Sequence, residues 1–308
     1  MKILLIRPGA LGDTILTLPV IDAIRSKHPD SEITLLGSSQ FSFLLPQDIR
    51  TVSYESREWA WIFEASPCHN LPSKTDIDVA YVVLKNSNTV VRNLHNAGIP
   101  TIVASSSPQE GVSLVQTLCR RLCLPDPQRK AWLEQFQTKR KYNRLWVAPG
   151  SGSRKKNAPI ALFSEAVRVI REHHDVELVV TLGESDRWFL DDEDFVGFTK
   201  GSNAKTIHDS SLQNIMLTCC NSVLYIGNDS GASHLAAALN IPAILFFTVT
   251  DPQVWGPFAP TKNLLFQRVT GRHIIGSREH EDLLRRIAGF ATKHISESNT
   301  RYFRSNLS

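Results

Sequence analysis

The stretch Val223–Phe247, VLYIGNDSGASHLAAALNIPAILFF, decides the fold of this chain. Its first apolar run, Val223 to Ile226, leads into a turn that contains glycine and then into a helical stretch, His234 to Leu239. A second apolar run, Ala243 to Phe247, closes the stretch. Short apolar runs of this kind are typical of strands buried on both faces of a parallel sheet. The stretch therefore predicts a strand–helix–strand unit of an α/β fold.

The same alternation of apolar runs and helical periods continues through the rest of the chain. In the first half it predicts strands at 3–6, 33–36, 79–84 and 101–104, and helices at 14–27, 86–97 and 112–124. In the second half it predicts further strands at 145–148, 176–182 and 264–267, and helices at 160–173, 211–220 and 279–294.

The polar stretch 125–143, PDPQRKAWLEQFQTKRKYN, interrupts this alternation and contains two prolines, so we predict that it is the interdomain linker. A chain of 308 residues favours about two domains of ordinary size. We therefore predict an N-terminal domain at 1–138 and a C-terminal domain at 139–308, each a Rossmann-like parallel sheet covered by helices. Because such sheets bind ligands at the carboxyl ends of their strands, two of them facing each other predict a ligand site in an interdomain cleft.

The composition excludes several other classes of protein. With 42% hydrophobic and 21% charged residues, each half can bury a normal core. A net charge of +4 does not require a nucleic-acid partner. The five cysteines are odd in number and have no periodic spacing, which argues against a disulfide scaffold and predicts buried thiols.

The sequence also bears on location. The apolar run before Arg7 has four residues, which is too short for a signal peptide. No stretch approaches the roughly 20 apolar residues that span a bilayer. We therefore expect a cytoplasmic protein. The tail Arg301–Arg304 is compatible with peripheral contact at the inner face of the cytoplasmic membrane, although a solvated helix face explains it better.

The loop after the first predicted strand, Arg7–Thr14 (RPGALGDT), holds the first candidate site residue. Its glycines, Gly9 and Gly12, let the backbone turn sharply and approach a ligand closely. Asp13 precedes the predicted helix, so it can serve as a helix cap worth about 1 kcal/mol. It can also serve as a carboxylate that takes a proton from a bound hydroxyl. Because such caps are common, the residues alone favour the cap.

The second candidate loop, Ala148–Pro159 (APGSGSRKKNAP), combines glycine, serine and three consecutive cations before a helix. Backbone N–H groups, small hydroxyls, cations and a helix N-terminus all favour phosphate. Gly150 and Ser151 supply the turn and a hydroxyl, and Lys155 and Lys156 supply charge beside it. This loop therefore predicts a phosphate site.

The third candidate loop lies inside the stretch quoted first. Asp229 or Ser230 can cap the helix that follows, and the N–H groups of Gly231 and Ala232 can bind an anion. His234 is either a buried, hydrogen-bonded histidine or a ligand contact. A cap and an anion site are about equally supported by the spacing.

The run Asp191–Asp194 offers paired acids of the kind that bind Mg²⁺. A run of four acids is usually a solvated surface, and no phosphate-binding glycines adjoin it. We predict no metal site there.

Together these motifs resemble the ADP-heptose:lipopolysaccharide heptosyltransferase family, also called glycosyltransferase family 9. The resemblance covers residues 1 to about 260, and its most specific block spans about 30 residues in the expected order. The matching residues are Arg7–Asp13, Pro149–Ser151 with Lys156 and Pro159, Gly227–Gly231 with His234–Ala238, Ile241–Pro242, Thr250–Pro252 and Trp255–Pro257.

The resemblance implies a GT-B fold and a bacterial enzyme of lipopolysaccharide biosynthesis. It implies inverting, metal-independent transfer of a sugar without a cofactor, from a nucleotide-sugar donor, with ADP-heptose as the first candidate, to a glycan or lipid-linked glycan acceptor. The roles it implies are Asp13 as general base, Lys156 as a donor-phosphate contact, and Asp229, Ser230, Gly231 and His234 as contacts to diphosphate and sugar. Glu184 and Asp186, in a glycine–acid loop after a strand, are candidate ribose or base contacts.

Two features depart from the family's pattern. Ala158 stands where family members usually carry Trp, and the loop 183–186 matches only loosely. These departures favour an alternative, a nucleotide-sugar-binding protein without transferase activity. A nucleotide-sugar epimerase of similar architecture is a third interpretation. The missing G-x-G-x-x-G motif argues against an NAD-dependent enzyme.

Overall fold

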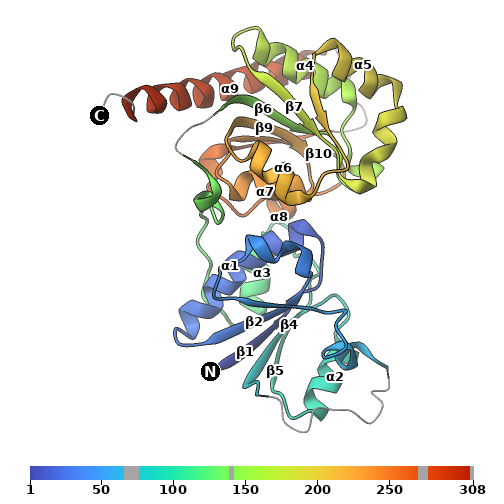
Figure 1. Ribbon diagram of the computed structural model, residues 1–308, viewed down its shortest axis with the longest axis vertical. Helices are drawn as coiled ribbons and strands as arrows, with labels where there is room; N and C mark the ends of the chain where they lie inside the picture. Colours follow the sequence, from blue (N-terminus) through green and yellow to red (C-terminus); the bar gives the residue numbers. More distant parts are fainter. Residues whose placement is uncertain (66–75, 139–141, 270–276, 306–308) are drawn as a thin grey trace. The chain divides into compact units, whose positions relative to one another are not determined.

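The computed structural model describes residues 1–65, 76–138, 142–269 and 277–305 (Figure 1). The chain divides into two compact units, Met1–Arg129 and Lys130–Ser308. Each unit has its own parallel sheet. Two α/β units with parallel sheets are therefore present, as the alternation of apolar runs and helical periods predicted.

The division between the units falls earlier than the predicted boundary after residue 138. Residues 130–138 attach to the second unit through hydrogen bonds to distant backbone carbonyls. Leu133 donates its N–H to the carbonyl of Ala238 at 2.8 Å, and the side chain of Gln137 donates to the carbonyl of Cys220 at 2.9 Å. The sequence predicted a linker here because the segment is polar, but these contacts make it part of the second unit.

The first unit is built on a five-stranded sheet in the order β3-β2-β1-β4-β5, with every neighbouring pair parallel. The strands are β1 (Lys2–Ile6), β2 (Glu32–Gly37), β3 (Arg50–Ser53), β4 (Val79–Val83) and β5 (Thr101–Ala104). The helices are α1 (Leu11–Lys27), α2 (Asn88–Asn96) and α3 (Leu114–Arg121), with 3-10 turns η1 (Ser39–Leu44) and η2 (Ala60–Phe63). The sequence missed β3, a short edge strand without a buried residue.

The second unit is built on a six-stranded parallel sheet in the order β11-β10-β9-β6-β7-β8. Its strands are β6 (Tyr142–Ala148), β7 (Glu177–Thr181), β8 (Lys205–Ile207), β9 (Ser222–Asn228), β10 (Ala243–Phe247) and β11 (Leu264–Arg268). Its helices are α4 (Ile160–Arg171), α5 (Glu193–Gly201), α6 (Leu212–Cys219), α7 (Gly231–Ala238), α8 (Pro252–Trp255) and α9 (Arg278–Ser305). Its 3-10 turns are η3 (Glu134–Phe136), η4 (Arg154–Lys156), η5 (Glu184–Asp191) and η6 (Thr261–Asn263).

The central strands are buried along their whole length. Every residue of β4, β9 and β10 is buried, which explains why these strands read as continuous apolar runs. Leu4 and Ile6 of β1 share a core with Leu94 of α2. In the second unit, the ring of Phe163 in α4 packs edge to face against the ring of Phe246 in β10, with ring centroids 5.2 Å apart.

The strand order reverses once in each sheet, between β1 and β4 in the first unit and between β6 and β9 in the second. Ligands of open α/β sheets bind outside the carboxyl ends of the strands at such a reversal. All three candidate loops follow one of these strands: β1, β6 or β9. Among the residues that the structure describes, no helix is long and apolar enough to cross a membrane.

Candidate active site

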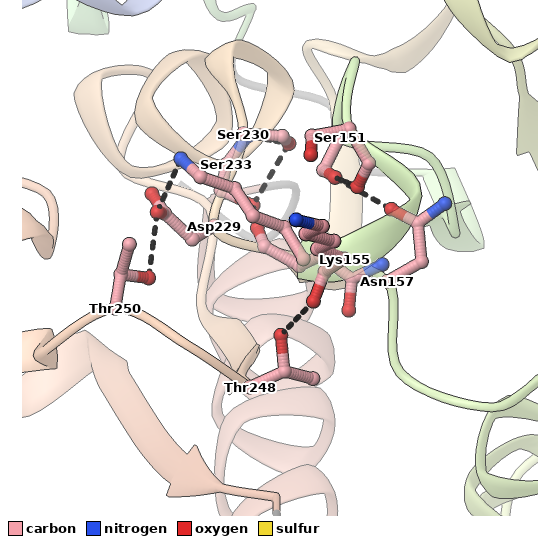
Figure 2. Close-up of polar contacts among 11 residues, drawn as sticks. Ser151, Lys155, Asn157, Asp229, Ser230, Ser233, Thr248 and Thr250 are labelled. Atoms are coloured by element: carbon pink, nitrogen blue, oxygen red, sulfur yellow. Dashed lines mark hydrogen bonds and ion pairs between the residues drawn. The ribbon is translucent and has the colours of Figure 1, made fainter.

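Four loops of the second unit gather at the carboxyl edge of its sheet. They follow β10, β9, β6 and β7, which are neighbours in that order and all parallel. Figure 2 shows side chains from three of these loops: the Thr250 hydroxyl points to the Asp229 carboxylate, and the Ser151 hydroxyl points to Asn157 of its own loop. The strand order therefore brings together residues that lie far apart in the sequence.

Asn228, at the end of β9, ties two of these loops together. Its side chain is fully buried, with 0% exposed. The side-chain oxygen accepts the N–H of Ala158 at 3.0 Å, and the side-chain nitrogen donates to the carbonyl of Pro149 at 2.5 Å. No role was predicted for Asn228 from the sequence, although a polar residue at the end of an apolar strand is a usable signal.

Asp229 forms a partly buried ion pair with Lys156. The Lys156 Nζ lies 2.8 Å from the Asp229 Oδ2, and their side chains are 33% and 6% exposed. The same carboxylate oxygen accepts a hydrogen bond from the Thr250 hydroxyl at 2.8 Å (Figure 2). A carboxylate this deeply buried needs such partners, because an unpaired buried charge is strongly unfavourable. Two residues that the sequence predicted as donor contacts thus touch each other, and Thr250 joins them.

Ser230 caps helix α7. Its backbone is extended and its hydroxyl accepts the N–H of Ser233 at 3.4 Å. The sequence left the cap open between Asp229 and Ser230, and the structure assigns it to Ser230. Gly231 begins the helix, whose first N–H groups have no acceptor within the helix and favour anions. The positive end of α7 and the ammonium group of Lys156 therefore belong to the same site.

Buried hydroxyl groups of Tyr225 and Ser233 support the turn between β9 and α7. The Tyr225 hydroxyl lies 3.0 Å from the Ser233 Oγ, and Ser233 in turn donates to the carbonyl of Asn228. Burial raises the pKa of Tyr225. Gly227 leaves room for this ring, since a Cβ there would lie 2.1 Å from the Tyr225 hydroxyl oxygen. His234 follows in α7 and is 6% exposed, as the interpretation of a buried histidine expects.

The glycine-rich loop after β6 is held by Asp186. The Asp186 Oδ1 accepts the N–H groups of Ser151 at 3.3 Å and Gly152 at 3.2 Å. Gly150 packs against the same carboxylate, where a Cβ would lie 2.1 Å from Oδ2. Burial raises the pKa of Asp186, and the hydrogen bonds from backbone N–H groups oppose that shift.

Asp186 is 7% exposed, and its carboxylate holds the β6 loop. The contact of Asp186 to a ribose or base stays a prediction. Glu184, at the start of η5, is exposed and keeps its role as a candidate contact.

The polar side chains of the β6 loop differ in what they offer a ligand. The Ser151 hydroxyl lies 2.5 Å from the Asn157 Oδ1 and 2.9 Å from the carbonyl of Ser153, so it is engaged within the loop. Lys155 is exposed, and its carbonyl accepts the Thr248 hydroxyl at 2.9 Å (Figure 2). Lys156 is the cation that the loop directs toward α7.

Asp13 lies inside the first turn of α1, together with Gly12, and does not precede the helix as the sequence predicted. The residue at the N-cap position is Ala10, whose N–H donates to the Asp13 Oδ2 at 3.3 Å. The Arg7 guanidinium donates to the Asp13 Oδ1 at 2.6 Å. Gly9 packs against this carboxylate, since a Cβ there would lie 2.6 Å from Oδ2. Asp13 therefore stabilises the start of α1, and its carboxylate is also a candidate contact for a ligand.

One residue of the acidic run Asp191–Asp194 caps a helix. Asp192, within the acidic run, caps α5 by accepting the N–H of Phe195 at 2.9 Å. In the described ranges, no three His, Cys, Asp or Glu side chains cluster as metal ligands.

Cys119 and Cys219 are buried, and burial raises the pKa of each to about 12. Cys123 is exposed, contrary to the prediction, and Cys68 lies outside the described residues.

Thr250→Val is expected to weaken pyrophosphate binding about fivefold, because a hydrogen bond of this kind contributes about 1 kcal/mol. Without the hydroxyl, Asp229 loses one hydrogen bond to its Oδ2, and the ammonium group of Lys156 is less well positioned. Isothermal titration calorimetry with pyrophosphate measures the change. Thr250→Ser retains the hydroxyl and serves as the control. Wild-type affinity in Thr250→Val would show that the hydroxyl does not position the pair.

The chain is similar to known proteins in sequence and in fold. The sequence profile of glycosyltransferase family 9 (heptosyltransferase) matches residues 115–274. No curated protein matches the chain.

Solved structures of similar fold cover nearly the whole chain. E. coli heptosyltransferase WaaC with ADP has a TM-score of 0.67 and 14% identity, covering 94% of this chain and 100% of its own. E. coli ADP-heptose lps heptosyltransferase II has a TM-score of 0.68 and 17% identity, and the match covers 97% of this chain and 100% of that protein. A family 9 glycosyl transferase from Veillonella parvula DSM 2008 has a TM-score of 0.64 and 16% identity, and the match covers 98% of this chain and 97% of that protein.

Proposed function

The chain belongs to glycosyltransferase family 9, and we propose that it moves a sugar from a nucleotide-sugar donor to a hydroxyl of a glycan acceptor, with inversion and without a metal ion. It is a glycosyltransferase with two parallel-sheet α/β units like those of the GT-B enzymes it resembles. One observation carries the proposal: an ion pair of Lys156 with buried Asp229 lies in the loops beside the N-terminus of α7, at the reversal between β6 and β9.

The second unit is proposed to hold the donor. The diphosphate binds the first N–H groups of α7 and the ammonium group of Lys156, since both favour negative charge. Lys156 has three N–H donors, so it can keep its bond to Asp229 while it binds a phosphate oxygen. The Asp229 carboxylate is an acceptor for hydroxyl groups of the donor's sugar. ADP-heptose is the first donor to test, because similar structures carry ADP or ADP-heptose in their names.

The first unit is proposed to supply the base. Asp13 takes the proton of the acceptor hydroxyl while that oxygen forms its bond to the anomeric carbon. The bond from the anomeric carbon to the diphosphate breaks on the opposite face, so the configuration inverts. The leaving nucleoside diphosphate carries the electron pair of the broken bond. Lys156 and the α7 N-terminus bind that developing charge more strongly than the ground state, which lowers the barrier.

The structure weakens the case for an inactive binding protein. Ala158, the main departure from the family's pattern, is 3% exposed, and its N–H donates to Asn228. Its side chain therefore packs in the core of the second unit. The loose match at 183–186 lies where Asp186 holds the β6 loop. Both departures concern packing, and neither removes a proposed donor contact.

A panel of nucleotide sugars tests the proposal, first by thermal shift, since a bound ligand stabilises the folded state. ADP-heptose is then incubated with lipid-linked and oligosaccharide acceptors, and products are identified by mass spectrometry. Transfer of the sugar to an acceptor supports the proposal. Binding without turnover on any acceptor would support the inactive binding protein. An isomerised sugar in the absence of acceptor would identify an epimerase.

Transfer is expected to continue at an unchanged rate in excess EDTA. Lys156 and the N-terminus of α7 already supply positive charge at the leaving diphosphate, so a divalent cation is not needed there. Initial rates with and without EDTA, and after addition of Mg²⁺, measure this. Loss of activity in EDTA that Mg²⁺ restores would contradict metal-independent transfer.

A further inference from the structure

Arg7 is a buried cation at the start of the loop that holds Asp13. It follows β1, and only 6% of its side chain is exposed. Burial lowers the pKa of Arg7, and the neighbouring Asp13 carboxylate opposes that shift. Keeping a guanidinium group out of water is unfavourable unless a partner compensates for it. Asp13, at 2.6 Å, is the carboxylate that does so.

The contact with Arg7 fixes one half of the Asp13 carboxylate. Oδ1 accepts the Arg7 guanidinium, and Oδ2 accepts the N–H of Ala10 at 3.3 Å. Gly9 packs against the same side chain. A carboxylate has about four acceptor positions, so positions remain for a substrate hydroxyl. The side chain of Asp13 is 39% exposed and that of Arg7 only 6%, so Asp13 is the member of the pair that offers more surface to a substrate.

We propose that Arg7 is the positioning residue for Asp13, a role that rests on Asp13 being the base of the proposed transfer. Arg7 orients the carboxylate before the acceptor binds. The acceptor proton passes to Asp13 as the new sugar–oxygen bond forms, and then to water. Arg7 itself neither takes nor gives a proton, since a guanidinium group stays protonated in proteins. Because Arg7 is buried, it acts only through Asp13.

The test compares Arg7→Met with Arg7→Lys in the full chain. Arg7→Met is expected to lower kcat about tenfold to a hundredfold, because a misplaced catalytic group costs this much. The KM for the donor should change less than about twofold, since the donor contacts lie in the second unit. Arg7→Lys restores a cation and should recover most of kcat. Wild-type kcat in Arg7→Met would overturn the proposal.

Arg25→Met is the matched control. Arg25 also forms an ion pair with an aspartate, Asp48, but it lies in the last turn of α1, away from the candidate loop, and 31% of its side chain is exposed. Its replacement should leave kcat unchanged. An equal loss of kcat in Arg25→Met and Arg7→Met would mean that any Arg–Asp pair of this unit matters through stability alone, which would also overturn the proposal.

A double-variant cycle separates positioning from folding. If Arg7 acts only through Asp13, Arg7→Met should cost nothing further in an Asp13→Asn background. The same loss in both backgrounds would refute the proposal. If Arg7→Met does not fold alone, Arg7→Gln, which keeps a donor without charge, takes its place under the same criteria. Full transfer by Asp13→Asn would instead refute the base, and with it the proposed mechanism, independently of Arg7.

Discussion

Asp13→Asn is expected to lower the rate of sugar transfer by about 10²- to 10⁴-fold, the usual cost of losing a general base. The amide cannot accept the acceptor's proton, although it keeps the shape of the side chain and can still accept a hydrogen bond from Arg7 or Ala10. Donor affinity should remain near the wild-type value, because the donor contacts belong to the second unit. Steady-state kinetics and calorimetry with the nucleoside diphosphate measure the two effects separately.

The ion pair complicates this experiment, because removal of the carboxylate leaves the Arg7 guanidinium buried without its anion. Breaking a fully buried pair costs about 3–5 kcal/mol. We expect a smaller loss here, since Asp13 is 39% exposed and water screens the pair. The variant Asp13→Asn with Arg7→Met removes both charges and should regain stability without regaining transfer. If this double variant regains both the wild-type midpoint of thermal unfolding and the wild-type rate of transfer, Asp13 has only a structural role.

Lys156→Ala is expected to weaken binding of the nucleoside diphosphate about tenfold to a hundredfold, which corresponds to about 1.4–2.8 kcal/mol. The variant loses the ammonium group that binds phosphate. It also leaves Asp229, with 6% of its side chain exposed, as a negative charge beside the diphosphate. Calorimetry with the nucleoside diphosphate gives the affinity, and the slope of affinity against salt concentration gives the electrostatic part.

Lys155→Ala is the matched control for Lys156, because it removes the same charge from the neighbouring residue. Lys155 is exposed, and its contact to Thr248 is made by the backbone carbonyl, so the substitution preserves it. We expect less than about a threefold loss of affinity from an exposed charge. An equal loss in both variants would mean that the loop attracts phosphate by its total charge and that Lys156 has no specific contact.

The sequence alone determined the two α/β units and the position of the candidate loops. Strands such as β9 and β10 are recognisable because burial on both faces requires a continuous apolar run. The loops follow from the strands, since glycine-rich turns mark where a strand ends and a helix begins. Short exposed strands such as β3 carry no such signal, and the sequence missed it.

Only the tertiary structure decided what each site residue touches. Lys156 meets Asp229 across 73 positions of the chain, and Asn228 meets Pro149 across 79. These contacts depend on β6 and β9 being neighbours in the sheet, which no local pattern reports. Asp186, in the turn after the neighbouring strand β7, likewise reaches Ser151, so a residue predicted only as a ligand contact also has a structural role in the β6 loop. Local periodicity reflects the burial of each strand, whereas the pairing of charges and hydrogen bonds depends on the order in which the strands assemble.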